Sequence, residues 1–137
     1  MSCWGWYDQG ALGVASNPDL DDHAVEVPGL TGVLAVEAAG SFYDPFSCAI
    51  RGDNTVVCWG SHPADGTSGT KDETRDVLTG NDGQPLARMI DLRAGASHVC
   101  ARQSTGQVSC WGGGLRGALE DGLKTSGVWP RLVTGFP

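Results

Sequence analysis

The chain has 137 residues, one domain's worth, of which 40% are hydrophobic and 18% are charged, so it lacks the sparse hydrophobicity and dense charge of a disordered chain. Nine Lys and Arg against 16 Asp and Glu give a net charge of −7, without a basic cluster, which argues against nucleic-acid binding. No apolar run approaches the roughly 18 residues of a membrane-spanning helix. The 21 glycines and 7 prolines indicate many turns and favour an all-β fold.

The chain begins Met-Ser-Cys-Trp-Gly-Trp, which has neither a basic start nor an apolar stretch. We therefore expect no signal peptide in this chain, and the start is expected to be a fragment boundary.

A Cys-Trp-Gly tripeptide then organises the chain. It occurs at 3–5, 58–60 and 110–112, at spacings of 55 and 52 residues, and a further cysteine lies ten residues before the second and third copies. Gly-Ala-Leu follows the first and third copies at equal distances, at 10–12 and 117–119. Repeats of this period with strand-like patterning predict β-propeller blades, each a four-stranded antiparallel sheet.

The repeats divide the chain into a half repeat (1–30), a repeat with a long loop (31–89) and a complete repeat (90–137). Propellers close with about four to eight blades. Because one chain holds only about two and a half repeats, we expect it to be part of a longer propeller or to associate with other copies into a closed ring.

Residues 95–101 (Gly-Ala-Ser-His-Val-Cys-Ala), the Cys-Trp-Gly at 110–112 and the Gly-Ala-Leu at 117–119 resemble the repeat of the regulator of chromosome condensation family. The resemblance covers essentially the whole chain and implies a β-propeller, seven-bladed in the best-known members. It also implies a structural hydrogen bond for His98. The insertion at 42–45 and the long loop at 61–83 depart from the family pattern.

Residues 46–59 and 98–111 each alternate and break at a polar turn, as a hairpin with a three-residue loop does. Directly opposed cross-strand residues bring their Cβ atoms close enough for a disulfide after a slight adjustment. The predicted register places four pairs opposite each other: Cys48 and Cys58, Ile50 and Val56, Cys100 and Cys110, and Arg102 and Val108.

Two matched cysteine pairs fit either one disulfide per blade or a metal site. Zinc ligands are usually two to four residues apart, so the ten-residue spacing favours the disulfides Cys48–Cys58 and Cys100–Cys110. Each would stabilise the fold by roughly 2–3 kcal/mol and indicates an oxidising, extracellular or periplasmic location. Cys3 is expected to be unpaired, because the repeat places its partner before the chain begins; no His or acid beside it supports a reactive nucleophile.

One tryptophan per repeat at a fixed position indicates a core between blades rather than a ligand platform. The expected repeat-core residues are Trp4, Trp59 and Trp111, with the glycines that follow them, Gly5, Gly60 and Gly112. Trp6 and Trp129 lie outside this phase and are candidate partner contacts, since aromatic residues are frequent in interface hot spots.

The acidic loop at 17–23 supplies three further candidate contacts, Asp19, Asp21 and Asp22. It lacks the Asp spacing of a calcium-binding loop, so we expect a solvated turn and no metal.

The expected function is a non-catalytic protein-binding module whose loops at 14–24, 42–46 and 61–85 meet a partner of unknown identity. The sequence has no nucleophile–base constellation and no cofactor motif, so we expect neither an enzyme nor a cofactor. The resemblance implies two alternatives: nucleotide exchange on a small GTPase, or inhibition of an extracellular hydrolase such as a β-lactamase.

Overall fold

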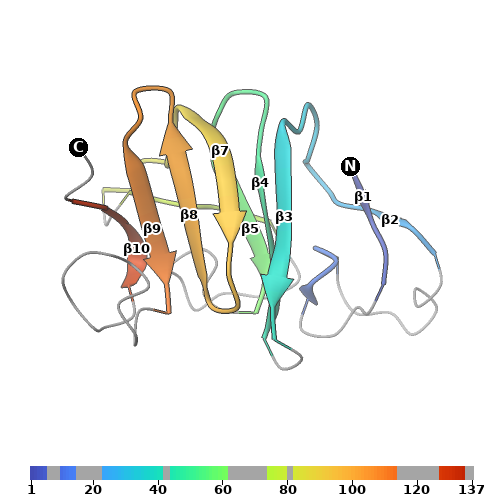
Figure 1. Ribbon diagram of the computed structural model, residues 1–137. Helices are drawn as coiled ribbons and strands as arrows, with labels where there is room; N and C mark the ends of the chain where they lie inside the picture. Colours follow the sequence, from blue (N-terminus) through green and yellow to red (C-terminus); the bar gives the residue numbers. More distant parts are fainter. Residues whose placement is uncertain are drawn as a thin grey trace.

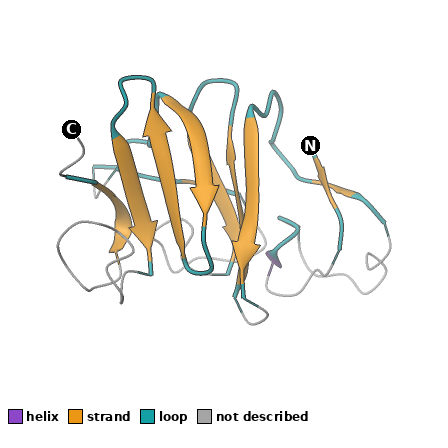
Figure 2. Ribbon diagram, viewed as in Figure 1, coloured by secondary structure: helices purple, strands orange, loops and turns teal. Residues whose placement is uncertain are grey.

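The computed structural model describes residues 1–5, 10–14, 23–41, 44–61, 74–79, 82–113 and 127–134. Within these ranges the fold is all-β, as predicted, and ten strands form one two-stranded and two four-stranded antiparallel sheets (Figures 1 and 2). The first sheet pairs β1 (Ser2–Cys3) with β2 (Val25–Glu26).

Each four-stranded sheet has its strands side by side in chain order, which is the meander of a propeller blade. The first blade consists of β3 (Ala35–Gly40), β4 (Pro45–Ile50), β5 (Val56–Gly60) and β6 (Arg75–Asp76), and the second of β7 (Met89–Ala94), β8 (His98–Gln103), β9 (Val108–Gly112) and β10 (Gly127–Leu132). The first blade lies within 31–89, and β7 begins at the last residue of that range. The repeat boundaries themselves stay predictions.

Both central hairpins have the predicted register. All four predicted pairs lie opposite each other: Cys48 with Cys58, Ile50 with Val56, Cys100 with Cys110, and Arg102 with Val108. In the first hairpin the Arg51 N–H donates to the Thr55 carbonyl at 2.9 Å, and Asn54 closes the loop with a φ of 65°. Gly106 takes the same place in the second hairpin, with a φ of 92°. Both loops are therefore three-residue turns that end in a left-handed residue.

The glycine of the Cys-Trp-Gly motif has a backbone role in all three copies. Gly5, Gly60 and Gly112 have φ angles of 114°, 95° and 105°, a region that side chains with a Cβ rarely adopt. At Gly60 a Cβ atom would also lie 2.7 Å from the carbonyl oxygen of Pro45. The motif thus ends on glycine because the chain turns there as it leaves the strand.

The two blades pack against each other, with β3 and β4 of the first contacting β7 of the second. Figure 1 shows β3 and β7 side by side in the middle of the molecule. The core between them contains buried apolar side chains from both sheets: Phe46, Cys48, Ile50, Val56, Cys58, Val77, Leu86, Met89, Leu92, Val99, Ala101 and Trp111. On its other side, the first blade packs against the β1–β2 pair through a smaller cluster that contains Val27, Leu30, Ala49, Val57 and Trp59.

Candidate protein-binding surfaces

Each blade has two different faces, because successive residues of a strand point to opposite sides of the sheet. In β5, Cys58 faces the core between the blades, and Trp59 faces the β1–β2 pair. In β9 the arrangement repeats one blade further along: Trp111 faces the core between the blades, and Cys110 points away from it. We call these the disulfide face and the tryptophan face. The disulfide face of one blade therefore packs on the tryptophan face of the next.

Both predicted cysteine pairs are disulfide-bonded. The Cα atoms of Cys48 and Cys58 are 4.1 Å apart, and so are those of Cys100 and Cys110. The first disulfide is enclosed between the blades, where its cysteines are 0% and 1% exposed. The second lies on the outward disulfide face of the second blade, where Cys110 packs on Val133 and Cys100 is half-buried.

The expected burial of Trp4 is wrong for this chain. Trp59 and Trp111 are 2% and 0% exposed, but Trp4 is 74% exposed. The alternation of faces explains the difference, since the tryptophan of a blade points toward the preceding blade, and no described residue covers Trp4 on that side. Trp4 thus lies on an outward tryptophan face at one end of the described structure. The Cys100–Cys110 disulfide lies on the outward disulfide face at the other end, where Cys110 is 2% exposed and Cys100 is half-buried. We call these two the open faces, because no other described sheet packs on them.

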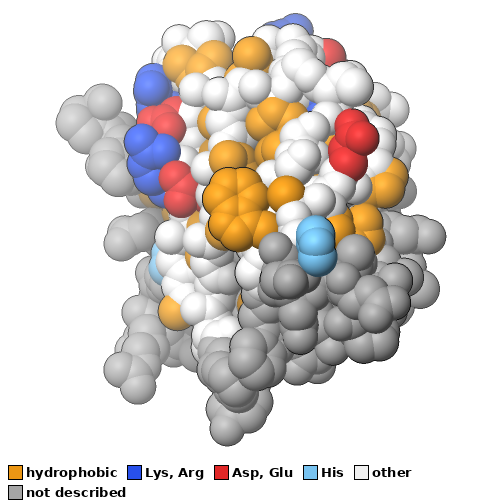
Figure 3. Space-filling model, turned by 90° about the vertical axis from the view of Figure 1, so that its right-hand side faces the viewer, with side chains coloured by type: hydrophobic (Ala, Val, Ile, Leu, Met, Phe, Trp, Pro, Cys, Tyr) orange, Lys and Arg blue, Asp and Glu red, His pale blue; other side chains and the backbone are white. Residues whose placement is uncertain are grey.

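A groove of about 320 Å³ lies beside β1, between this short strand and the tryptophan face of the first blade. Its lining includes Cys3, Trp4 and Leu12 from the N-terminal segment and Val36 and Ser47 from the first blade. Figure 3 shows this end of the molecule, where hydrophobic side chains gather in the middle of the face and charged side chains lie toward its margin. Sequence reasoning missed the groove, because it forms between segments more than thirty residues apart.

The only free cysteine among the described residues is Cys3, which agrees with its predicted place outside the two disulfides. Burial raises the pKa of its thiol above the usual value, and the nearby terminal ammonium group lowers it by a smaller amount. A raised pKa keeps the thiol protonated and slow to react at neutral pH. The thiol is half-buried at the wall of the groove.

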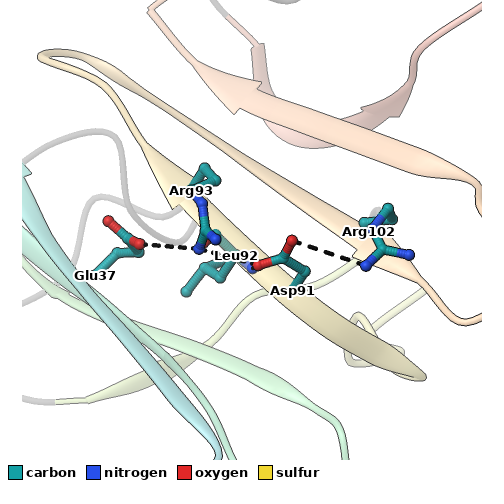
Figure 4. A network of polar contacts seen from close by, with 5 residues as sticks. All are labelled: Glu37, Asp91, Leu92, Arg93 and Arg102. Carbon is teal, nitrogen blue, oxygen red and sulfur yellow. Dashed lines mark hydrogen bonds and ion pairs between the residues drawn. The ribbon is translucent and has the colours of Figure 1, made fainter.

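A chain of ion pairs links the innermost strands of the two blades (Figure 4). The Arg93 guanidinium lies 3.2 Å from the Glu37 carboxylate of the first blade and 3.0 Å from that of Asp91. Arg102 lies 3.8 Å from the other oxygen of Asp91. Arg93 is 73% exposed, so water screens these pairs, and they orient the blades more than they stabilise them.

Two hydrogen bonds also join the blades at the turn of the first hairpin. The Asn54 side-chain amide donates to the Met89 carbonyl at 2.9 Å, and the Met89 N–H donates to the Asn54 carbonyl at 3.0 Å. Because Asn54 also adopts the left-handed conformation that closes its turn, one residue fixes both the hairpin and the position of the next blade.

Of the predicted contact residues, Trp129 lies within the described ranges. Trp129 is half-buried in β10, whereas Trp6, Asp19, Asp21 and Asp22 lie outside the described residues. The imidazole of His98 packs against Gly95, where a Cβ atom would lie 2.5 Å from the ring.

Within the described part of the chain, no three His, Cys, Asp or Glu side chains come together as metal ligands. In the same ranges no helix has the length and apolar character needed to cross a membrane.

No protein-family model matches the chain. It is 31% identical over 133 residues to the ultraviolet-B receptor UVR8 of Arabidopsis thaliana, an alignment that covers 96% of this chain and 29% of the receptor. Human WBSCR16 has a similar structure, with a TM-score of 0.74 and 19% identity over 96% of this chain and 34% of that one. Prp20p of Saccharomyces cerevisiae gives a TM-score of 0.71 at 16% identity, covering 99% of this chain and 34% of Prp20p. The chain thus spans about a third of the length of each of these proteins.

Proposed function

Because the repeats of this chain are those of the regulator of chromosome condensation family of β-propellers, we propose that the chain is a non-catalytic protein-binding unit. In this proposal its two open faces take further blades, and the added blades complete a closed ring. The observation that carries this proposal is the exposure of Trp4. The same motif position is buried in both complete blades, where another sheet covers it.

The occupied interface within the chain indicates how the open faces would be covered. Trp111 of the second blade packs in one core with the Cys48–Cys58 disulfide of the first. By the same geometry, Trp4 of one copy fits against the Cys100–Cys110 disulfide of another. Such a contact is head-to-tail, and it closes into a ring when the rotation per copy allows it.

One structurally similar protein supports a protein as the partner, since Prp20p binds Gsp1p and histones. The two disulfides of this chain favour an oxidising compartment, outside the cell or in the periplasm. Blade stacking does not depend on which partner the loops meet.

Binding between copies tests this proposal directly. With one copy immobilised and another in solution, Trp4→Ala should weaken association by about 30-fold or more, because a large aromatic side chain at a contact centre contributes about 2 kcal/mol or more. Ile90→Ala is the matched control, since Ile90 is an exposed apolar residue on an inner strand away from Trp4. Equal affinity of both variants and the unmodified chain would remove the proposed contact.

A further inference from the structure

The chain adopts the same left-handed backbone conformation in front of the inner strand of each complete blade. Glu37 of β3 and Arg93 of β7 each lie opposite the first cysteine of their blade's disulfide, so they occupy the same repeat position. Five residues before them lie Gly32 and Arg88, whose φ angles are 62° and 65°. The fold therefore requires the left-handed conformation at this position in both blades.

Arginine is a strained choice for this conformation. Glycine adopts it without a steric penalty, whereas a Cβ atom crowds the backbone there. Asn54, the other described residue besides glycine with a positive φ, is of a type that tolerates the conformation. Arg88 is exposed, and within the described ranges its guanidinium makes no hydrogen bond or ion pair that would offset the strain. Strained residues of this kind cluster at functional sites, which makes Arg88 a candidate contact residue.

An exposed apolar side chain lies two positions after Arg88. Ile90 is 47% exposed, and it is the extra residue of a β-bulge, because its two neighbours in β7 lie opposite consecutive residues of β8. Bulges turn a side chain in a new direction and are frequent beside functional sites. In Figure 1, β7 begins at the same upper end of the molecule as the turns of both central hairpins. Arg88 and Ile90 therefore lie together at this end of the second blade.

The strands around this position carry more positive than negative charge. Together with β3, β7 and β8, the position holds three arginines, Arg88, Arg93 and Arg102, and two carboxylates, Glu37 and Asp91. Arg93 and Arg102 share the Asp91 carboxylate, and Arg93 also pairs with Glu37 (Figure 4). Arg88 is left as the net positive charge, in a chain whose overall net charge is −7. An acidic segment of a partner therefore complements this position, and a basic segment is repelled.

The backbone beside Arg88 is held in place by the first blade. The Met89 N–H donates to the Asn54 carbonyl at 3.0 Å, and the Met89 carbonyl accepts from the Asn54 side-chain amide at 2.9 Å. In the same turn the Asp53 carboxylate accepts hydrogen bonds from Thr55, which engage it within its own turn. A site whose backbone is already fixed loses little conformational entropy when it binds a partner.

We propose that Arg88 and Ile90 form a docking site for an acidic peptide segment of a partner protein. The Arg88 guanidinium binds a carboxylate of the segment, and a nearby apolar side chain of the segment packs on Ile90. The site lies at the end of the second blade and on neither open face, so it goes beyond the proposed closure of a ring and does not depend on it.

Selection from a phage-displayed library of random peptides tests the proposal. Peptides that combine Asp or Glu with Leu, Ile or Phe should be enriched on the unmodified chain. The most enriched peptide, fluorescently labelled, should bind Arg88→Gln about tenfold or more weakly, because a charge-assisted hydrogen bond is lost. Arg131→Gln is the matched control, since it removes the same charge from β10, at the other edge of the same sheet, and should change the affinity less than about twofold. A selection without acidic peptides, or equal binding by Arg88→Gln, would overturn the proposal.

Further variants separate docking from a structural role of Arg88. Arg88→Gly removes the strain, so it should raise the midpoint of thermal unfolding while it abolishes peptide binding. Arg88→Glu should bind the same peptide only after its acidic residues are changed to lysine. A lower unfolding midpoint for Arg88→Gly, or no recovery in the charge exchange, would overturn the proposal. The native mass of Arg88→Gln should equal that of the unmodified chain, so a failure of peptide binding and a failure of ring closure are observed separately.

Discussion

At the scale of single residues, the three motif tryptophans show that burial depends on the neighbouring sheet as well as on the sequence around a residue. Trp4, Trp59 and Trp111 have the same neighbours in sequence, and the repeat pattern correctly predicted burial for the last two. Trp4 could not be distinguished by local pattern, because the sheet that would cover it is not part of the structure described.

Substitution of these tryptophans should separate folding from association. Trp111 is fully buried between the blades, so Trp111→Ala should lower the free energy of unfolding by about 3–5 kcal/mol. Trp4→Ala should change it by less than about 0.5 kcal/mol, because the side chain is largely in solvent. Urea unfolding at a concentration low enough to keep the chain monomeric measures both. A large loss for Trp4→Ala would mean that Trp4 packs within its own chain.

Asp53 in the first hairpin turn should titrate below the usual range. Its carboxylate accepts hydrogen bonds from the Thr55 hydroxyl at 2.6 Å and the Thr55 N–H at 3.0 Å, which lower the pKa of Asp53. The resulting stabilisation is present above the pKa of an unfolded aspartate, about 3.9, and is lost as the pH falls through the lower folded value. Carboxyl NMR titration should give a midpoint below 3.9, and Thr55→Val should raise it. A midpoint that Thr55→Val leaves unchanged would refute this cause.

At the scale of strands and turns, the sequence was sufficient wherever the relevant contacts are local. Alternation and the polar loops at 52–54 and 104–106 predicted both hairpins and their registers, because a three-residue turn fixes which residues face each other. Two contacts between the blades were not predictable from local patterns. Asn54 and Met89 are 35 positions apart in the sequence, and Glu37 and Arg93 are 56 positions apart.

The two disulfides should differ in their resistance to reduction. Both cysteines of Cys48–Cys58 are enclosed between the blades. In the second disulfide Cys110 is also buried, at 2% exposed, but Cys100 is half-buried on an outward face. Under mild reductant, differential alkylation and mass spectrometry should show Cys100 and Cys110 modified first, and the non-reduced chain should be four hydrogens lighter than the fully reduced chain. Simultaneous modification of all four cysteines in a folded chain would contradict the assignment of the outward face.

Asn54 should stabilise the fold in two separable ways, through its side-chain hydrogen bond to the Met89 carbonyl and through its left-handed conformation in the turn. Asn54→Gly keeps the left-handed turn and removes the side-chain bond to the Met89 carbonyl, so we expect a loss of about 0.5–1.5 kcal/mol. Asn54→Ala also forces a Cβ-bearing residue without polar compensation into a φ of 65°, which should cost about 1 kcal/mol more. Thermal unfolding of the two variants measures the difference. Equal stabilities would show that the turn conformation contributes nothing.

At the scale of the whole molecule, the sequence predicted the class of fold, and the structure adds the order in which the faces of successive sheets pack. The repeat period predicted propeller blades, and the alternation of disulfide and tryptophan faces shows that the two interfaces among the described residues have the same order along the chain. The groove beside β1 could not be predicted, because its walls come from segments that are far apart in the sequence.

The most direct measurement is the native mass of the unmodified chain by light scattering after size exclusion, at several concentrations and without reductant. If the open faces bind further blades, the chain should form a discrete assembly of about two or three copies of 14.3 kDa, enough for the four to eight blades of a closed propeller. A chain that stays monomeric at every concentration would contradict the proposal that its two open faces complete a ring with other copies.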